Sequence, residues 1–348
     1  MSFRQFLLFA ALLLAARLAS AQQLRYALPA PDAPVALLSA GHRAYLVTQH
    51  GVWERRGRRL LPCYRSPQPL TAALAADSVG QLWLGTRQGL RRLSLRTGQV
   101  RELPAAPAAP VTALLRDGTG HVWVGLAGYG AYELAGRHAD SLAVRLQVPG
   151  ISCGLATADG AVWLGTNLGL HRYQAGRWTR YNEEGVANHE IPDNLVERLL
   201  PDGTGRVWVV MSEAVCLLDA TPASPAAAHD ELPTARFVGQ PGNAVHSVAY
   251  APGAGWLLAT DLGLLLLPGT HGPAEPAGFA PAATDVVAPQ ALLRPLPTGP
   301  GPRPSLVQRD AHSRLWLASE AGLTVWSART LRRLAATPVA AAASARAQ

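Results

Sequence analysis

Apolar and polar residues alternate along most of the chain in short runs that are separated by turn residues. In the run Gln81–Thr86, one face carries large apolar side chains, as expected of a half-buried strand. Asp-Gly pairs stand between such runs and supply the bends of hairpins. The pattern predicts an all-β protein made of many short strands.

One unit of this pattern recurs seven times. It consists of a strand, a Gly/Asp turn, a second strand that contains Trp, a short turn that ends in Gly, and a third strand. The clear copies are 70–93, 111–134, 151–173, 195–218 and 304–327, and the degenerate copies are 35–54 and 245–267. The Trp position is filled by Tyr45, Trp83, Trp123, Trp163, Trp208, Leu257 and Trp316.

A period near 40 residues, made only of strands, is the length of one four-stranded propeller blade. We therefore predict a β-propeller of seven four-stranded blades rather than a solenoid, whose coils are usually shorter. The segment 176–181 is the right length for an outer fourth strand. A similar segment, Gln23–Leu28, is expected to be the outer strand of the last blade, which closes the ring and removes its free edges.

Two regions depart from the period within the propeller, which we place at residues 22–334. Residues 268–304 hold ten prolines and few strand formers, so we expect a long loop or a partly disordered insertion. Residues 335–348 are almost entirely Ala, Ser and Pro, and we expect a disordered tail.

Residues 1–21 have the features of a secretory signal peptide. A positive charge at Arg4 precedes an apolar run at 7–16, and the small residues 19–21 form a cleavage site before Gln22. Neither this run nor any later one reaches the roughly 20 apolar residues of a membrane-spanning helix. We expect a periplasmic or secreted protein without a membrane span.

Composition narrows the classes further. With 49% hydrophobic and 16% charged residues, the chain of 348 residues is globular rather than disordered. Its net charge of +8 comes from scattered arginines and no lysine, so no nucleic-acid partner is expected. The three cysteines, Cys63, Cys153 and Cys216, are widely spaced, which indicates neither a disulfide framework nor a metal site. We expect Cys153 and Cys216 to be buried as small apolar residues.

The repeat resembles that of the two-component regulator propeller family. The order of that repeat is Asp, Gly, then Leu-Trp-Ile-Gly-Thr, then Gly-Leu, a basic residue and Tyr. The segment 159–173 follows this order throughout, and the segment 191–209 resembles its first part, up to the Trp. The resemblance implies the periplasmic sensor part of a hybrid histidine kinase, a class that often controls the use of complex carbohydrates. Full sensors have about twice as many repeats, a membrane helix and a kinase. This sequence shows no kinase or membrane segment, so we expect it to pass a signal to a separate protein.

The turns between the second and third strands carry the candidate binding residues, because ligands of propellers commonly lie over the central channel. Four residues past the Trp position stand Gln49, Arg87, Ala127, Asn167, Ser212, Asp261 and Glu320. The predicted ligand-binding residues are Gln49, His50, Arg87, Tyr129, Asn167, Asp261 and Glu320. Such a ring can hydrogen-bond and stack on a polar small ligand or an oligosaccharide. The alternative is that these residues only cap tight turns.

Other chemistry is not indicated. The pairs Asp117-Gly118, Asp159-Gly160 and Asp202-Gly203 lack the ligand pattern of a calcium loop and are interpreted as hairpin turns. The repeated tryptophans at positions 83, 123, 163, 208 and 316 are expected to pack between neighbouring sheets. We predict no catalytic residue, no metal and no cofactor.

The sequence favours a non-enzymatic, sensor-like propeller that binds a carbohydrate or a related polar ligand. One alternative is a platform for an envelope protein, bound at the rim and at the proline-rich insertion. The other is a propeller lyase similar to the streptogramin lyases, with His246 or His50 as general base.

Overall fold

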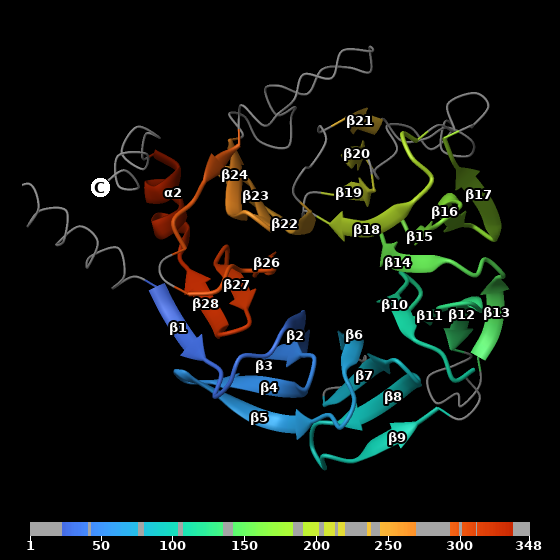
Figure 1. Ribbon diagram of the computed structural model, residues 1–348, viewed down its shortest axis with the longest axis horizontal. Coiled ribbons are helices and arrows are strands. Elements are labelled where there is room, and N and C mark those ends of the chain that lie inside the picture. The colour runs from blue at the N-terminus through green and yellow to red at the C-terminus, as the bar shows by residue number, and fades with distance from the viewer. Residues whose placement is uncertain are drawn as a thin grey trace, which may run out of the picture.

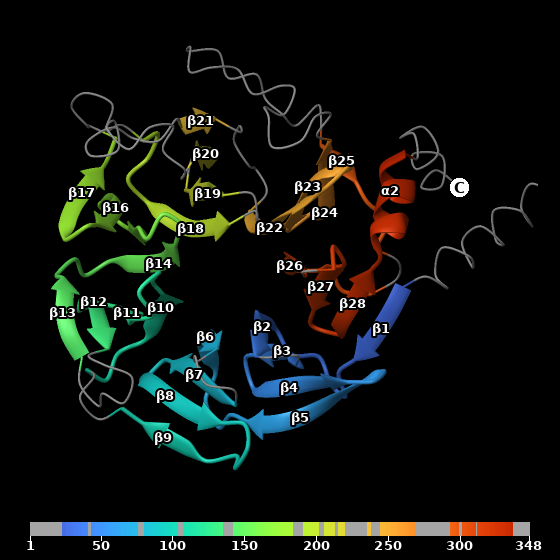
Figure 2. The same ribbon diagram turned by 180° about the vertical axis from the view of Figure 1, so that it is seen from behind.

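Seven antiparallel sheets of four strands stand in a ring in the computed structural model of the chain (Figures 1 and 2). The structure describes residues 23–40, 43–75, 80–103, 107–134, 142–183, 191–201, 205–212, 215–219, 235–237, 244–268, 293–298, 301–310 and 312–336. The predicted signal peptide, residues 1–21, lies outside this range. The predicted seven-bladed all-β propeller is confirmed.

Each blade has an inner strand beside the central channel and an outer strand at the rim, and we call its strands A to D in that order. Blade 1 is β2 (Pro34–Ala40), β3 (Arg43–Thr48), β4 (Gly51–Arg56) and β5 (Arg59–Arg65), and blade 2 is β6 (Leu70–Ala75), β7 (Gln81–Thr86), β8 (Gly89–Ser94) and β9 (Val100–Glu102). Blade 3 is β10 (Val111–Arg116), β11 (Val122–Leu126), β12 (Gly130–Leu134) and β13 (Leu142–Leu146), and blade 4 is β14 (Ile151–Ala156), β15 (Val162–Thr166), β16 (Gly169–Gln174) and β17 (Arg177–Tyr181).

Blades 5 and 6 are longer in sequence than the first four, and blade 7 combines two distant parts of the chain. Blade 5 is β18 (Val196–Pro201), β19 (Arg206–Met211), β20 (Val215–Asp219) and β21 (Ala235–Phe237). Blade 6 is β22 (Val245–Ala251), β23 (Gly255–Thr260), β24 (Gly263–Pro268) and β25 (Arg294–Pro295). Blade 7 takes β26 (Leu306–Arg309), β27 (Leu315–Ser319) and β28 (Gly322–Trp326) from the end of the chain and β1 (Gln23–Ala27) from its beginning.

The N-terminal strand closes the ring, as the sequence predicts. β1 pairs antiparallel with β28 from Gln23 opposite Trp326 to Ala27 opposite Gly322. The Leu28 amide then donates to the carbonyl of Ala321 at 2.9 Å. Two distant parts of the chain thereby complete one sheet, seen side by side in both views (Figures 1 and 2).

The repeated tryptophans form the packing between blades, which confirms the interpretation of these residues as core. Trp123, Trp163 and Trp208 are at most 1% exposed, and Trp83 and Trp316 are also buried. The indole of Trp123 donates to Asp117 at 2.9 Å and that of Trp316 donates to Asp310 at 3.0 Å. The turn carboxylates therefore accept hydrogen bonds from indole N–H groups that would otherwise be buried without a partner.

The Asp117 carboxylate is fully engaged within its own turn. It accepts the amides of Thr119 and His121 at 2.9 Å in addition to the indole of Trp123. Burial acts to raise the pKa of Asp117, but these hydrogen bonds outweigh burial and hold it below its ordinary value. Asp117-Gly118 is thus a structural turn, as predicted. Residues 202–204 lie outside the described part of the chain, so Asp202-Gly203 stays a prediction.

The turn between strands B and C requires glycine at its end. In blade 4, Gly169 has φ of 103°, and a Cβ at this position would collide with the carbonyl of Tyr181 on the outer strand. The Thr166 hydroxyl fixes the turn, since it donates to the Gly169 carbonyl at 2.7 Å and accepts the Leu168 amide at 2.9 Å. Asn167 and Leu168 are consequently held outward, on the face of the ring where the B–C turns lie.

Three details were not apparent from the sequence. The proline-rich segment 268–304 contains a short strand, β25, which pairs with Leu265 and Leu266 as the outer strand of blade 6. An α-helix, α2 (Ala328–Ala336), follows the last blade and includes the first two residues of the predicted tail. Ser327 caps this helix by accepting the Thr330 amide at 3.1 Å, and Leu331 is buried against blades 6 and 7. Residues 337–348 lie outside the described range.

The cysteines do not form disulfides. Cys216 is buried, as predicted, whereas Cys153 and Cys63 are partly buried. Burial raises the pKa of Cys153 to about 11 and that of Cys216 to about 12, so both stay protonated thiols. Within the described residues, no helix is both long and apolar enough to cross a membrane.

Candidate functional site

The predicted binding residues all lie on one face of the ring. Strands alternate in direction, so every B–C turn and every connection from strand D to the next strand A lies at the same end of the channel, which we call the BC face. The predicted residues in the B–C turns of six blades are exposed: Gln49, His50, Arg87, Tyr129, Asn167, Asp261 and Glu320. The structure therefore places them on a common surface.

In blade 1, His50 belongs to a hydrogen-bonded pair that joins the B–C turn to the connection from β1 to β2. Its Nδ1 lies 2.9 Å from Oδ1 of Asp32, and its amide donates to Oδ2 of the same carboxylate at 3.1 Å. Asp32 stands in the connection from β1 to β2. His50 is therefore partly a structural residue, since it ties the blade 1 turn to the closing strand.

In blade 6, Asp261 is the centre of a polar cluster. Its Oδ1 lies 2.7 Å from Nε2 of His246, and Arg303 donates to its backbone carbonyl. The hydrogen bond from His246 is the main reason that the pKa of Asp261 lies below its ordinary value, and the charge of Arg198 in blade 5 acts in the same direction. Asp261 is thus an ionised carboxylate bonded to His246 of its own blade, and its turn is also bonded to Arg303 of the connection to blade 7.

The other predicted residues have side chains without a hydrogen bond or ion pair among the described residues. These side chains are those of Gln49, Arg87, Tyr129, Asn167 and Glu320. Their polar atoms are available to a ligand, because they are exposed and make no turn-capping bond of their own. His50 and Asp261 thus bond to residues at the entry to their own blades, whereas the side chains of these five make no such bond among the described residues.

Exposed apolar side chains gather on the same face. Tyr129 is 51% exposed, Leu168 44%, Leu195 44% and Leu262 66%. All four stand in B–C turns or in the connection that enters blade 5, whereas the other large exposed apolar residues described lie on outer strands. The BC face of blades 3 to 6 is therefore amphipathic.

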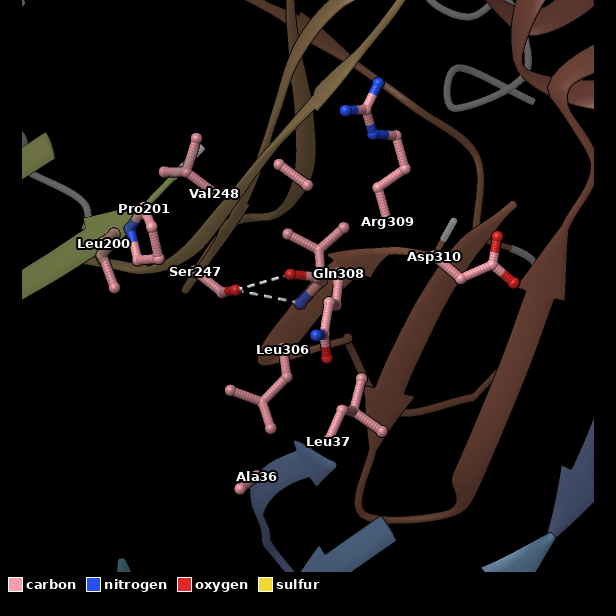
Figure 3. Close-up of a pocket in the computed structure, with 12 residues that line it drawn as sticks. Ala36, Leu37, Leu200, Pro201, Ser247, Val248, Leu306, Gln308, Arg309 and Asp310 are labelled. Carbon is pink, nitrogen blue, oxygen red and sulfur yellow. Dashed lines mark hydrogen bonds between the residues drawn. The ribbon is translucent and has the colours of Figure 1, made fainter. Parts of the chain in front are cut away.

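The predicted residues do not surround a single cavity. A cavity of about 480 Å³ lies in the central channel, and Figure 3 shows its lining from β2, β18, β22 and β26. Ser247, Gln308, Arg309 and Asp310 contribute its polar side chains, while residues such as Leu37 and Leu306 contribute apolar ones. A second cavity, of about 220 Å³, lies between β1, β28 and the residues Thr298, Gly301, Pro302 and Pro304. None of the seven predicted residues lines either cavity.

Several polar residues on the BC face were missed by the sequence reasoning. Asp32 and Asp193 lie in connections between blades, and Asp193 accepts a hydrogen bond from Ser212 at 2.5 Å. Arg303 lies in the proline-rich segment, which has no repeat partner. Arg198 lies on an inner strand, where comparing the copies position by position would have shown it as the one large residue among small ones.

The arrangement can bind a polar ligand and can move a proton at the His246–Asp261 pair. A histidine whose ring is held by a carboxylate is a possible general base. Within the described residues, no group of three or more His, Cys, Asp or Glu side chains could hold a metal ion.

Comparison with known proteins gives structural neighbours only. No protein-family model and no curated protein sequence matches the chain. The extracellular domain of the putative hybrid two-component system BT4673 from B. thetaiotaomicron is 16% identical, with a TM-score of 0.62 over 87% of this chain and 39% of that one. The corresponding domain of BT3049 from the same organism is 13% identical, with a TM-score of 0.58 over 86% of this chain and 40% of that one.

An enzyme has a similar fold. A catalytically inactive histidine-to-alanine variant of virginiamycin B lyase from Staphylococcus aureus, with quinupristin, is 13% identical, with a TM-score of 0.59 over 87% of this chain and 97% of that one. At these identities the likeness shows the propeller fold alone. The chain spans about two fifths of the length of the two sensor domains, whose fold agrees with the resemblance seen in the repeat.

Proposed function

We propose that this protein is an extracytoplasmic, non-enzymatic propeller of the sensor type, which recognises a polar ligand on its BC face. Carbohydrate is the ligand class we favour. The fold shared with extracellular sensor domains supports the sensor class, and the predicted signal peptide supports the location.

One observation carries the proposal: polar and aromatic side chains without internal partners are displayed around the channel on a single face. Arg87 and Glu320 can bond hydroxyl groups, and Tyr129 can stack on a sugar ring. If these residues served only the turns, their side chains would be hydrogen-bonded to the turn backbone, as that of Thr166 is.

A thermal-shift screen with oligosaccharides tests the proposal. A ligand present at about one hundred times its Kd stabilises the folded state by about 2.7 kcal/mol. We expect at least one glycan to raise the unfolding midpoint of the wild type and not that of the Arg87→Ala/Asp261→Ala/Glu320→Ala variant.

A matched variant on the opposite face provides the control. Arg58→Ala/Arg96→Ala/His312→Ala also removes three exposed polar side chains, but from A–B and C–D turns. This variant should keep the ligand-dependent shift. A screen without any shift, or a shift lost equally in both variants, would contradict ligand recognition on the BC face.

The exposed apolar residues favour a second candidate, a platform for an envelope protein. Tyr129, Leu168 and Leu262 could anchor a partner, since aromatic and aliphatic side chains dominate the energetics of interfaces. Cross-linking in the native envelope, with Tyr129→Ser/Leu168→Ser/Leu262→Ser as comparison, tests it. A specific adduct that the variant loses would support the platform, and an unchanged adduct pattern would contradict it.

The His246–Asp261 pair supports a third candidate, a lyase. The 2.7 Å contact supplies a histidine whose ring nitrogen is held for proton transfer. Incubating the protein with cyclic depsipeptides of the streptogramin B type and following ring opening by mass spectrometry tests this function. Turnover that His246→Ala abolishes would establish it, and no turnover would leave a binding protein.

A further inference from the structure

The inner strands of six blades share an irregularity at the BC end of the channel. Pairing between strands A and B shifts by one residue after the first pair, so that the second residue of strand A is a β-bulge. The bulge residues in blades 1 to 6 are Val35, Thr71, Thr112, Ser152, Glu197 and His246. The residues at which pairing resumes are Ala36, Ala72, Ala113, Cys153, Arg198 and Ser247.

In blades 2 and 4 the bulge residue joins neighbouring blades. Thr71 donates its hydroxyl to the carbonyl of Val111 at 2.7 Å, and Ser152 donates to the carbonyl of Val196 in the same way. Ser247 makes the equivalent link from blade 6 to blade 7 at 2.9 Å. Small hydroxyl residues at the channel mouth are thus part of the architecture.

Blades 5 and 6 depart from this rule at adjacent places. Glu197 and His246 replace the small or β-branched bulge residue, and Arg198 occupies a position that is Ala, Cys or Ser in the five other bulged blades. A large charged group is not needed to pair the strands there, since five blades pair without one. The three departures lie on neighbouring inner strands at the same level of the channel.

Arg198 stands on the inner strand of blade 5, which packs against the inner strand of blade 6. It is partly buried, and among the described residues it makes no hydrogen bond or ion pair. Its charge acts on Asp261 of blade 6 and on Cys153 of blade 4. A partly desolvated guanidinium of this kind favours an anion from solution, and its planar fork matches a carboxylate.

We propose that Arg198, with Glu197, His246 and Asp261, forms a binding subsite for the carboxylate-bearing unit of an acidic oligosaccharide, such as a uronic acid. This inference rests on the proposed function and names its ligand class. Arg198 would bind the carboxylate, the acceptor oxygens of Glu197 and Asp261 would bond sugar hydroxyls, and the exposed Leu262 offers an apolar surface to the C–H face of the ring.

Calorimetric titration of the full chain with trigalacturonate and with its neutral counterpart, a trigalactoside, tests the subsite. Arg198→Ser is the main variant, because Ser247 occupies the equivalent position in blade 6 and the exchange is compatible with the fold. Losing a charge-assisted hydrogen bond weakens binding by roughly tenfold to a hundredfold. We expect the Arg198→Ser variant to bind the acidic trisaccharide more weakly by this factor. The Arg198→Lys variant should show most of the same loss of affinity, and the opposite-face variant Arg58→Ser should show none.

The outcomes separate the subsite from the proposed function. Tighter binding of the acidic trisaccharide that depends on Arg198 supports the subsite. Equal binding of both trisaccharides overturns the subsite and leaves ligand recognition on the BC face standing. The same conclusion follows if Arg198→Ser leaves binding of the acidic trisaccharide unchanged while the Arg87/Asp261/Glu320 variant loses it. If neither these nor the other oligosaccharides of the thermal-shift screen bind the wild type, both are wrong. Sodium sulfate at equal ionic strength must not compete, since competition would mean a non-specific anion effect and would overturn the subsite.

Discussion

Blades 1 to 4 and blades 5 to 7 place their charged residues differently. The residue on strand C opposite the Trp position is Glu54, Arg92, Glu133 or Arg172 in the first four blades. It is Leu217, Leu266 or Val325 in the last three. At the channel mouth the order is reversed, because blades 1 to 4 have small or β-branched residues there and blades 5 and 6 have Glu197, Arg198 and His246.

The charges of blades 1 to 4 have partners within their own sheets. Glu133 lies 2.6 Å from Nε of Arg145, and Arg172 lies 3.2 Å from Asp159 and over the ring of Trp163 at 5.1 Å. Such charges belong to the packing of the blade. The charges at the mouth of blades 5 and 6 reach solvent, and Arg198 has no ion-pair partner among the described residues. The comparison teaches that a charge with a partner inside its own blade serves the packing of that blade, whereas a charge that departs from the other copies and reaches solvent is a candidate for a role outside the fold.

Removing a tryptophan from blades 1 to 4 should have the largest effect on stability. Trp163→Ala leaves a cavity in a fully buried site and also removes the surface on which Arg172 rests. We expect the free energy of unfolding to fall by about 3–5 kcal/mol, measured by urea denaturation. The same change at Trp208, opposite Leu217, should cost no more. A loss below about 1.5 kcal/mol at Trp163 would break the assignment of these tryptophans to the core.

Acid should destabilise the folded protein through His171 of blade 4. Burial, with a smaller contribution from the charge of Arg180, lowers the pKa of His171 to about 4. As the pH falls below about 6.5, the unfolded chain takes up a proton that the folded state still excludes, so stability is lost progressively down to about pH 4. We expect a loss of about 2–3 kcal/mol between pH 7 and pH 4.5, and His171→Phe should lose less over this interval. Equal pH profiles for the two proteins would contradict this account.

Breaking a link between blades at the channel mouth should have a moderate effect. Thr71→Val removes the hydroxyl that bonds to Val111 but keeps the shape, and blade 1 already has Val35 at the equivalent position. We expect a loss of about 1 kcal/mol in the free energy of unfolding. A Gln99→Ala exchange in an exposed turn of the same blade serves as the control, and a Thr71→Val effect no larger than that control would show that the link is not stabilising.

Restoring the repeat at the mouth of blades 5 and 6 should have the smallest effect on stability. Glu197→Thr/Arg198→Ala/His246→Thr gives these blades residues that blades 1 to 4 use. We expect the free energy of unfolding to change by less than about 0.5 kcal/mol, since Glu197 is exposed, Arg198 has no ion-pair partner among the described residues, and a surface pair such as His246–Asp261 contributes little. A loss above about 2 kcal/mol would mean that the three residues support the fold, and the contrast between the two halves would fail.

The local pattern was sufficient to predict the blades because each one is built from contacts between neighbouring strands. The Trp position and the Gly at the end of the B–C turn recur with a period near 40 residues, and both have a direct physical role in the sheet. The outer strand of blade 6 was missed because Arg294 and Pro295 pair across a segment with no strand pattern. Helix α2 was missed because its sequence, rich in Ala and Arg, resembles the tail that follows.

The sequence by itself determined the fold, the number of blades, the closure by β1 and the face on which the turn residues lie, since these follow from repeated local pairing. Only the tertiary structure decided which of those residues have partners, and it decided that the predicted set lines no common cavity. It also brought Arg198, His246 and Asp261, from blades 5 and 6, to the same end of the channel. Arg198 and Asp261, 63 positions apart in sequence, come to the same end of the channel because adjacent blades present equivalent positions side by side. The period in the sequence implies this arrangement of blades, but only the strand register, with its bulge after the first pair, shows which residues occupy the equivalent positions.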